Sequence, residues 1–153
     1  MRAIVFEGTL QFRNDVELRP SKNDDVIVDV IKAGICETDL QLCKGYMGFS
    51  GTLGHEFVGI VEKVGAGVTR IAPGMRVSGE GHITAGHDYL SRTGNAHIAT
   101  DTKIIGVDRD GCFADYLMLP ETNVWPMHPS IPDKFAAIMD PLGNAVHTVM
   151  SAG

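Results

Sequence analysis

The chain has 153 residues, of which 44% are hydrophobic and 21% charged, and its formal charge at pH 7 is −6. The acidic balance argues against a nucleic-acid surface, which needs clustered lysine and arginine side chains. No apolar run approaches the roughly 20 residues of a membrane-spanning helix, and the N-terminus lacks the apolar core of a signal peptide. We therefore expect a cytoplasmic domain with neither nucleic acid nor a membrane as partner.

Short β-rich runs separated by turns dominate the chain, which favours a sheet or barrel over a helical bundle. The strongest predicted strand, residues 26–33, is rich in β-branched side chains. Another strand begins directly after Gly54-His55-Glu56. The predicted strands cover residues 2–6, 26–33, 57–64, the end of 73–77, 113–119 and 122–126. The fold class is therefore mainly β with a few helices.

Two stretches are predicted to be helical. Thr38 is expected to act as the N-cap of a short helix through residue 42. In the C-terminal tail, Pro141 and Gly143 predict a break between a helix over residues 133–139 and a second helix over residues 144–151. Residues 79–102 lack hydrophobic periodicity and are expected to form a surface loop or lobe.

The three cysteines, an odd number, do not predict a disulfide framework, and in a reducing compartment they are thiols. Cys43 and Cys112 are interpreted as small buried hydrophobes. Cys36 differs because a histidine and a carboxylate follow it at Gly54-His55-Glu56. A thiolate, an imidazole and a carboxylate are ligands of zinc sites that leave one coordination position open.

The positions of these residues suit a shared metal. Cys36 follows one predicted strand and His55 precedes another, so both can meet at one edge of a barrel. Adjacent strand residues point to opposite faces, so His55 and Glu56 reach one metal only if the backbone turns at Gly54. We predict His55 as a ligand, and Glu56 as a ligand or as a group held beside the metal.

Three further polar residues are candidates. Asp140 lies between two apolar stretches, where a metal or a helix-capping role would explain it equally well. Asp39 is a candidate acceptor for the imidazole N–H of His55, which would fix the tautomer of that ring. Thr38 could pass on a substrate proton, since a hydroxyl both donates and accepts hydrogen bonds.

Residues 33–40 and 54–59 resemble the zinc-dependent medium-chain alcohol/polyol dehydrogenases. Residues 76–84, 111–117 and 140–148 are similar to the L-threonine 3-dehydrogenase branch of that family. The resemblance covers essentially the whole chain and implies a GroES-like, partly open β-barrel. It also implies NAD(P)-dependent oxidation of a secondary alcohol, polyol or L-threonine-like, at one zinc ion.

The resemblance also implies roles for single residues. Asp140 matches the position of a further zinc ligand beside Cys36 and the His-Glu pair. Thr38 would begin the proton relay. His82 matches a position near the substrate pocket, with a solvated loop histidine as the alternative. Asn144 occupies a candidate position for a nicotinamide contact.

Two departures from the family qualify these expectations. Members commonly carry a structural zinc bound by four cysteines, but the matching positions here are Ala85, Asp88, Ser91 and Ala99. We therefore expect no tetrathiolate zinc and a mobile or restructured lobe. A metal bound by lobe side chains is the less favoured alternative, with the candidates His87, Asp88, His97 and Asp101.

The second departure concerns the nucleotide. A dinucleotide-binding fingerprint needs a third glycine and a following helix, and Gly65-Ala66-Gly67 has neither. We expect residues 1–153 to form the catalytic domain alone, with the Rossmann domain absent, NAD(P) bound only with that domain, and no activity of the chain by itself. The connection containing residues 45–51 is shorter than is usual for threonine dehydrogenases, which limits the substrate prediction to a secondary alcohol or polyol.

A non-enzymatic GroES-like module that binds a metal or a partner is the alternative function. Its interface would be the C-terminal face with Val146, Val149 and Met150, where a homo-oligomer or partner domain could pack. Metal-free relatives that reduce quinones or enoyl substrates rank last, since they lack the Cys and His-Glu ligands that this chain has.

Overall fold

The computed structural model describes residues 1–19 and 22–152. Its strands are β1 (Ala3–Phe6), β2 (Leu10–Arg13), β3 (Asp25–Gly34), β4 (Gly51–Thr52), β5 (Glu56–Val64), β6 (Arg76–Gly79), β7 (His82–Ile83), β8 (Lys103–Ile104), β9 (Tyr116–Pro120) and β10 (Val124–Pro126). Its helices are α1 (Glu37–Leu42), α2 (Tyr89–Arg92), α3 (Asp133–Ala136) and α4 (Met139–Ser151), with the 3-10 turns η1 (Tyr46–Gly48), η2 (Ala96–Ile98) and η3 (Glu121–Asn123).

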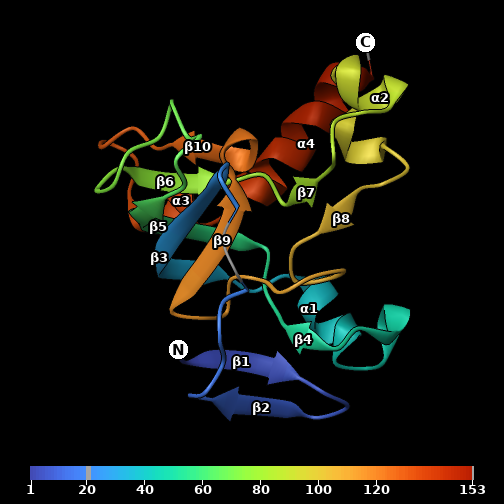
Figure 1. Ribbon diagram of the computed structural model, residues 1–153. Helices are drawn as coiled ribbons and strands as arrows, with labels where there is room; N and C mark the ends of the chain where they lie inside the picture. Colours follow the sequence, from blue (N-terminus) through green and yellow to red (C-terminus); the bar gives the residue numbers. More distant parts are fainter. Residues whose placement is uncertain (20–21, 153) are drawn as a thin grey trace.

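The strands form three antiparallel sheets (Figure 1). The largest has the order β10-β6-β5-β3-β9, the second the order β2-β1-β4, and β7 pairs with β8. In the described residues β9 and β10 are the two edges of the large sheet and do not pair with each other, so the barrel stays open. The expected mainly β, partly open barrel is therefore confirmed.

Strand β5 has more buried residues than any other strand of the large sheet. Phe57 and Val61 pack into the main core, which also contains Val26 of β3. The neighbouring Val58 points to the other face and packs against Ala136 and Ala137 beside α3, because side chains alternate along a strand. Burial on both faces fixes the start of β5, directly after His55.

A second core holds α1 against the small sheet. It consists of Phe6, Leu42, Phe49, Leu53 and Val107, all buried. Leu42 is the last residue of α1 and is fully buried. This packing fixes the short helix, and with it the segment that carries Cys36.

The expected strands are present, with differences at their ends and additions between them. Strand β2 was not predicted, although its four residues alternate between apolar and polar side chains; all four are exposed or half-buried, so the strand has no buried face. The prediction of Thr38 as an N-cap is wrong. The helix begins at Glu37 with Cys36 as N-cap, because the Asp39 carboxylate accepts the Cys36 backbone N–H at 2.8 Å.

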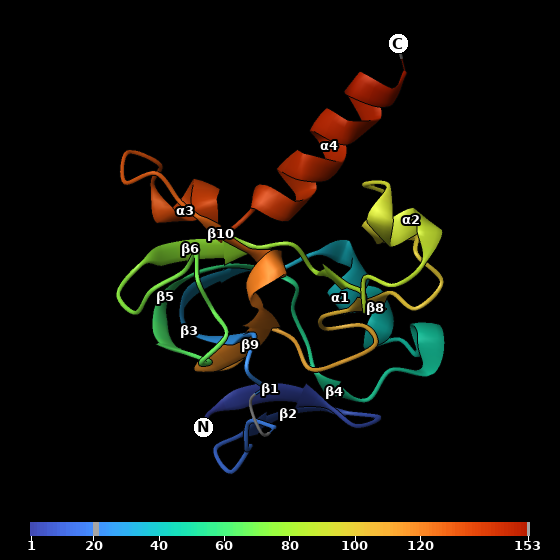
Figure 2. The same cartoon turned by 45° about the horizontal axis from the view of Figure 1, so that its top comes forward.

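The predicted break at Pro141 is also wrong. The chain breaks earlier, between α3 and α4, and Pro141 and Gly143 lie inside α4 (Figure 2). Pro141 is the third residue of α4, where a backbone N–H would have no partner within the helix. The proline ring therefore costs no hydrogen bond. Figure 2 also shows α4 projecting away from the sheets.

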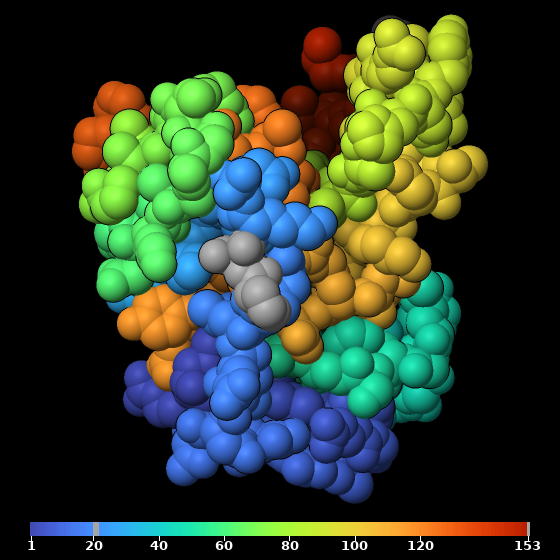
Figure 3. Space-filling model, in the orientation of Figure 1, coloured from blue at the N-terminus to red at the C-terminus, as the bar shows by residue number. Residues whose placement is uncertain are grey.

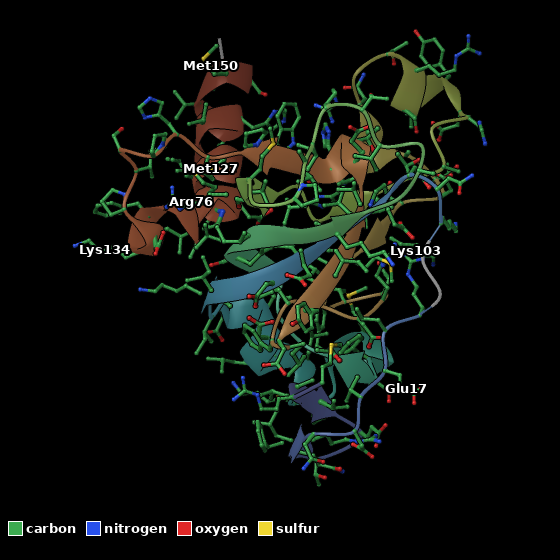
Figure 4. All side chains as sticks on the ribbon, turned by 60° about the vertical axis from the view of Figure 1, so that its left-hand side comes forward. Glu17, Arg76, Lys103, Met127, Lys134 and Met150 are labelled. Atoms are coloured by element: carbon green, nitrogen blue, oxygen red, sulfur yellow. The ribbon has the colours of Figure 1, made fainter. Side chains whose placement is uncertain are left out.

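Arg76 joins the large sheet to the segment before α4. Its guanidinium contacts Asp133 at 2.6 Å and donates to the backbone carbonyl oxygens of Ile131 at 2.7 Å and His128 at 3.2 Å. Figure 4 shows the Arg76 side chain between the sheet and α3. No helix in the described residues is long and apolar enough to cross a membrane.

Candidate metal centre

The backbone turns sharply just before the His-Glu pair. Gly54 has a φ of 94°, a left-handed conformation that favours glycine. The sequence-based expectation of a turn at Gly54 is therefore confirmed. As a result, His55 and Glu56 do not point to opposite sides of a regular strand.

Three side chains converge after this turn. Cys36, His55 and Glu56 each bring one ligand atom into a group in which all such atoms lie within 4.8 Å of one another. Three donors bound to one tetrahedral zinc lie about 3.3–3.8 Å apart. His55 and Glu56 are buried and Cys36 is half-buried. The thiol, imidazole and carboxylate are all donors that zinc accepts, and their spacing and burial are compatible with one shared zinc ion.

Glu56 occupies space that a glycine leaves free. A β-carbon on Gly34, at the end of β3, would collide with the Oε2 atom of Glu56. Burial raises the pKa of the Glu56 carboxyl, and the neighbouring His55 partly opposes this shift. The carboxylate is thus held against Gly34 at an electrostatic cost that a cation nearby would reduce.

Asp39 connects the two segments that carry the group. Its Oδ2 accepts the backbone N–H of Cys36 at 2.8 Å and its Oδ1 accepts that of Gly54 at 3.2 Å. Its carboxylate is buried, as polar groups with satisfied hydrogen bonds can be. The expected contact with His55 is looser, since Oδ1 lies 3.6 Å from Nδ1.

The Nδ1 atom of His55 is a buried polar atom without a hydrogen-bond partner among the described residues. Its nearest carboxylate is that of Asp39. Because the side chain is only 10% exposed, water offers little compensation. An imidazole in this state suits a ligand role, since metal binding at one nitrogen strengthens the N–H donor at the other.

Thr38 lies on α1 and Asn144 on α4. The Thr38 hydroxyl is 3.6 Å from the Sγ atom of Cys36. Asn144 lies one turn after Asp140 on α4, and its amide contacts the Asp140 carboxylate at 3.3 Å. Its side chain is exposed.

Asp140 and His82 form the outer part of the site. The Asp140 carboxylate lies outside the group of three ligand atoms. Burial raises its pKa and Glu80 raises it further, while His55 and His82 oppose both effects. Asp140 is therefore close enough to His55 for their charges to interact, but its carboxylate is not one of the three converging ligand atoms.

His82 is held by a residue that the sequence reasoning did not single out. Glu80 Oε1 accepts the backbone N–H of His82 at 2.8 Å and contacts Nδ1 of its ring at 2.5 Å. This hydrogen bond raises the pKa of His82 and lowers that of Glu80. The other ring nitrogen, Nε2, remains for another partner.

Asn123 was also missed. Its buried amide donates to the backbone carbonyl oxygens of Glu80 at 2.9 Å and His82 at 2.8 Å. The Glu80 N–H in turn donates to the Asn123 carbonyl at 2.9 Å. Asparagine is a common turn residue, and no spacing rule connects Asn123 to a segment 41 residues earlier.

The lobe between β7 and β8 is ordered without thiols. Asp88 caps α2 by accepting the Ser91 N–H at 2.7 Å and also accepts the Thr100 N–H at 3.2 Å. Asp101 accepts the Ala85 N–H at 2.9 Å. The carboxylates of Asp88 and Asp101 thus hold the lobe together through hydrogen bonds to its backbone.

No group of three possible metal ligands forms in the lobe among the described residues. The lobe instead contacts α4, where the rings of His97 and His147 meet edge to face at 5.2 Å between centroids. In Figure 3 the lobe (yellow-green) and the end of α4 (dark red) stand together above the rest of the molecule. Figure 4 places Met150 at the far end of that helix.

The chain matches a known family over most of its length. Residues 22–130 match the alcohol dehydrogenase GroES-like domain. The chain belongs to this family, within the zinc-dependent medium-chain dehydrogenases. An L-threonine 3-dehydrogenase from Mesorhizobium japonicum is 45% identical over 134 residues, which are 84% of this chain and 39% of that protein. The chain thus spans about two-fifths of this relative's length.

Solved structures agree with this assignment. A protein described as a zinc-binding dehydrogenase from Sinorhizobium meliloti 1021, bound to NADP, has a TM-score of 0.86 and 33% identity over 97% of this chain and 44% of that one. An alcohol dehydrogenase from E. coli CFT073, complexed with NADH, also has a TM-score of 0.86, with 30% identity over 92% of this chain and 42% of that one. The GroES-like fold expected from the sequence is therefore confirmed.

Proposed function

We propose that this chain forms the zinc-binding part of an NAD(P)-dependent dehydrogenase that oxidises a secondary alcohol, with a polyol or an L-threonine-like compound as substrate. The observation that carries the proposal is the convergence of Cys36, His55 and Glu56 within 4.8 Å. These three residues would hold one zinc ion. Asp140, whose carboxylate lies just outside the group, would complete the ligand set.

When bound, zinc supplies a Lewis acid that polarises the substrate oxygen, and NAD(P) accepts the hydride. Asp39 keeps Cys36 and Gly54 in register through two hydrogen bonds, so the ligand geometry is formed in advance. Thr38, beside the Cys36 sulfur, accepts the proton of the substrate hydroxyl and passes it outward. His82, with Nδ1 held by Glu80, presents Nε2 to the substrate.

The nucleotide would be held largely by residues outside this chain. Gly65-Ala66-Gly67 connects β5 to β6 and opens no helix, so this segment lacks the geometry for a pyrophosphate. Asn144, exposed on α4 one turn after Asp140, would supply a contact to the nicotinamide from this side. Two similar structures are complexes with NADP and with NADH, which supports a nicotinamide cofactor for the proposed dehydrogenase.

A partner-binding module without catalysis is the second candidate. It is favoured by α4, where four apolar side chains are more than half exposed: Leu142, Val146, Val149 and Met150. Exposed apolar surface of this kind marks association sites. The same surface would serve a further domain in the dehydrogenase proposal, so metal content discriminates between the two candidates.

The deciding experiment is zinc content per chain by plasma mass spectrometry after metal-replete purification. The wild type is expected to contain about one equivalent, as a single catalytic site requires. Cys36→Ala should lose it. Cys43→Ala, which removes a half-buried thiol at the other end of α1, should retain it. A wild type without zinc would favour the partner-binding module.

The reaction is tested with a fusion. The chain is joined to the part of the Mesorhizobium japonicum relative that its match does not cover, and nicotinamide reduction is followed with L-threonine and with simple secondary alcohols. We expect turnover by the fusion, none by its Cys36→Ala variant, and none by the chain alone. Turnover by the chain alone would contradict the proposed location of the nucleotide site.

A further inference from the structure

The residue before His55 is held on both of its backbone groups. The N–H of Gly54 donates to Asp39 Oδ1 at 3.2 Å. Its carbonyl oxygen accepts the N–H of Cys112 at 2.9 Å. The Gly54 carbonyl belongs to the peptide that joins Gly54 to His55, and the Gly54 N–H belongs to the peptide before it. The two hydrogen bonds therefore fix the peptide planes on both sides of the turn that leads into His55.

Cys112 belongs to a segment whose backbone is hydrogen-bonded to residues 52–54, which lead into the turn before His55. Asp110 Oδ1 accepts the Thr52 N–H at 2.9 Å, and the N–H of Gly111 donates to the Thr52 carbonyl at 2.7 Å. The N–H of Phe113 donates to the Leu53 carbonyl at 2.8 Å. We call residues 110–113 the backing segment.

The backing segment approaches so closely because Gly111 has no side chain. A β-carbon on Gly111 would lie 2.6 Å from the Leu53 carbonyl oxygen and still closer to that of Gly54. Ordinary β-carbon contacts begin at 3.4 Å, so alanine requires the two backbones to separate by about 0.8 Å or more. Gly111 does not have a positive φ, so this constraint is purely steric.

A second glycine packs into the same place. A β-carbon on Gly106 would lie 2.7 Å from the backbone nitrogen of Gly54 and 2.8 Å from its carbonyl carbon. A β-carbon on Gly54 itself would overlap the ring of Phe113. Gly54 therefore has the backbone of two glycines and an aromatic ring packed against it.

Cys112 adds a contact beyond the turn. Its Sγ atom donates to the backbone carbonyl of Glu56 at 3.4 Å. Burial raises the pKa of this thiol well above its usual range, so the sulfur keeps the proton that it donates. The backing segment thus contacts the chain on both sides of His55.

We propose that Gly111 is a positioning residue for His55. Its missing side chain lets the backing segment hold the Gly54 carbonyl, which sets the direction of the imidazole toward Cys36 and Glu56. A displacement of more than about 0.8 Å at Gly54 misaligns a ligand set that tolerates only about 0.5 Å. The inference rests on the proposed zinc site, because its effect is measured at the metal.

The experiment is a Co²⁺ titration of the full chain with three glycine variants. Co²⁺ accepts the same donors as zinc, and its thiolate charge-transfer and d–d absorption bands report the ligands and their geometry. Gly111→Ala is expected to weaken Co²⁺ binding roughly 10- to 100-fold, as other residues that orient metal ligands do. Its d–d spectrum should change as well.

Gly65→Ala is the matched control for a steric clash. A β-carbon on Gly65 would lie 2.6 Å from the Lys22 carbonyl oxygen, as close as one on Gly111 would lie to Leu53, but at the turn after β5. This variant should lose stability and keep the wild-type spectrum and affinity. Gly81→Ala, whose β-carbon would meet only Ile105 at 3.4 Å, should change neither stability nor binding.

A gentler variant covers the case in which Gly111→Ala does not fold. Asp110→Ala introduces no clash and removes the acceptor of the Thr52 N–H. It should weaken Co²⁺ binding in the same direction, by at least about threefold. Wild-type affinity and spectrum in Gly111→Ala, or in Asp110→Ala where the former is unfolded, would overturn the role of Gly111 while leaving the zinc site intact. A wild type that binds no Co²⁺ would overturn the proposed function and this inference together.

Discussion

The carboxylate of Glu56 lies directly over the α-carbon of Gly34, with no space between them for a β-carbon. Glu56 opens β5 and Gly34 ends β3, and the two residues are paired across the large sheet. The position of one candidate metal ligand therefore depends on the absence of a side chain on the adjacent strand. This dependence gives the first prediction.

Gly34→Ala should displace the Glu56 carboxylate and weaken zinc binding by roughly tenfold or more. In a Glu56→Ala background the obstacle is gone, so the same substitution should have little further effect. A double-mutant cycle on zinc affinity, measured by chelator competition, checks this. Equal effects of Gly34→Ala in both backgrounds would show that it acts through the fold and not through Glu56.

Gly143→Ala is a suitable control for this cycle. Gly143 lies inside α4, and nothing lies within 4 Å of the position of its β-carbon. Alanine there should leave zinc affinity unchanged and stabilise the helix by up to about 1 kcal/mol.

The three thiols should differ in reactivity. Cys112 is buried, and this burial raises its pKa, so its thiol stays protonated at neutral pH. Cys36 and Cys43 are half-buried. Iodoacetamide should label these two in the metal-free protein, and Cys112 only after denaturation, as read by peptide mass mapping. Labelling of native Cys112 at the rate of Cys43 would contradict the enclosure of Gly54.

Asp88 should stabilise the lobe without a metal. Asp88→Ala removes the N-cap of α2 and the acceptor of the Thr100 N–H, which is expected to cost about 0.5–2 kcal/mol of local stability. Hydrogen exchange of residues 84–102 should speed up in this variant. Asp29→Ala, an exposed strand position, is the control.

The same hydrogen-exchange measurement is repeated on the wild type in the presence of a chelator. Since the lobe has no thiol at the four positions of the family's structural zinc, chelation should leave its exchange rates unchanged. Faster exchange of the wild-type lobe in the presence of chelator would reveal a metal there.

Arg76→Lys should lower the free energy of unfolding by about 1–2 kcal/mol, discounted for the partial exposure of the ion pair. A lysine cannot reproduce a guanidinium that contacts Asp133 and two carbonyl oxygens at once. Urea unfolding measures the loss. Arg92→Lys, at a side chain without hydrogen bonds in the described residues, should stay within about 0.5 kcal/mol of wild type.

The apolar face of α4 should promote self-association of the isolated chain. Val149 is 74% exposed and Met150 77% exposed, so Val149→Lys with Met150→Lys should reduce association without lowering the melting temperature. Light scattering over a range of concentrations follows the first effect and calorimetry the second. A wild type that stays monomeric at high concentration would count against an interface on this helix.

The sequence predicted those parts of the candidate site that depend on the chemistry of the residue type. Cys36, His55 and Glu56 are unusual donors next to predicted strands, and Gly54 was the residue at which the chain had to turn. The sequence could not show that Asp39 bonds two segments at once, because that depends on how α1 packs. Nor could it show Gly111, since the role of a glycine is set by the backbone that approaches it.

The errors in the fold have local causes. Pro141 predicts a helix break unless its place within the helix is known, and the first turn tolerates it. Thr38 is a better N-cap by residue type than Cys36, but the Asp39 carboxylate bonds the Cys36 N–H and moves the helix start. Strand β2 alternates apolar and polar residues, but it is only four residues long and its apolar side chains, Leu10 and Phe12, are exposed, so no contact with a core identifies it.

The start of α4 beside the sheets has a mechanical consequence. Its 13 residues extend about 20 Å, and a rigid tilt of roughly 10° about Ile138 would move the far end by about 3 Å. Asp140, two residues from that pivot, would move only about half an ångström. Such a tilt would adapt the far end of the helix to whatever binds there. The lobe would follow through the contact between His97 and His147. The Asp140 carboxylate would stay almost still beside the candidate metal ligands.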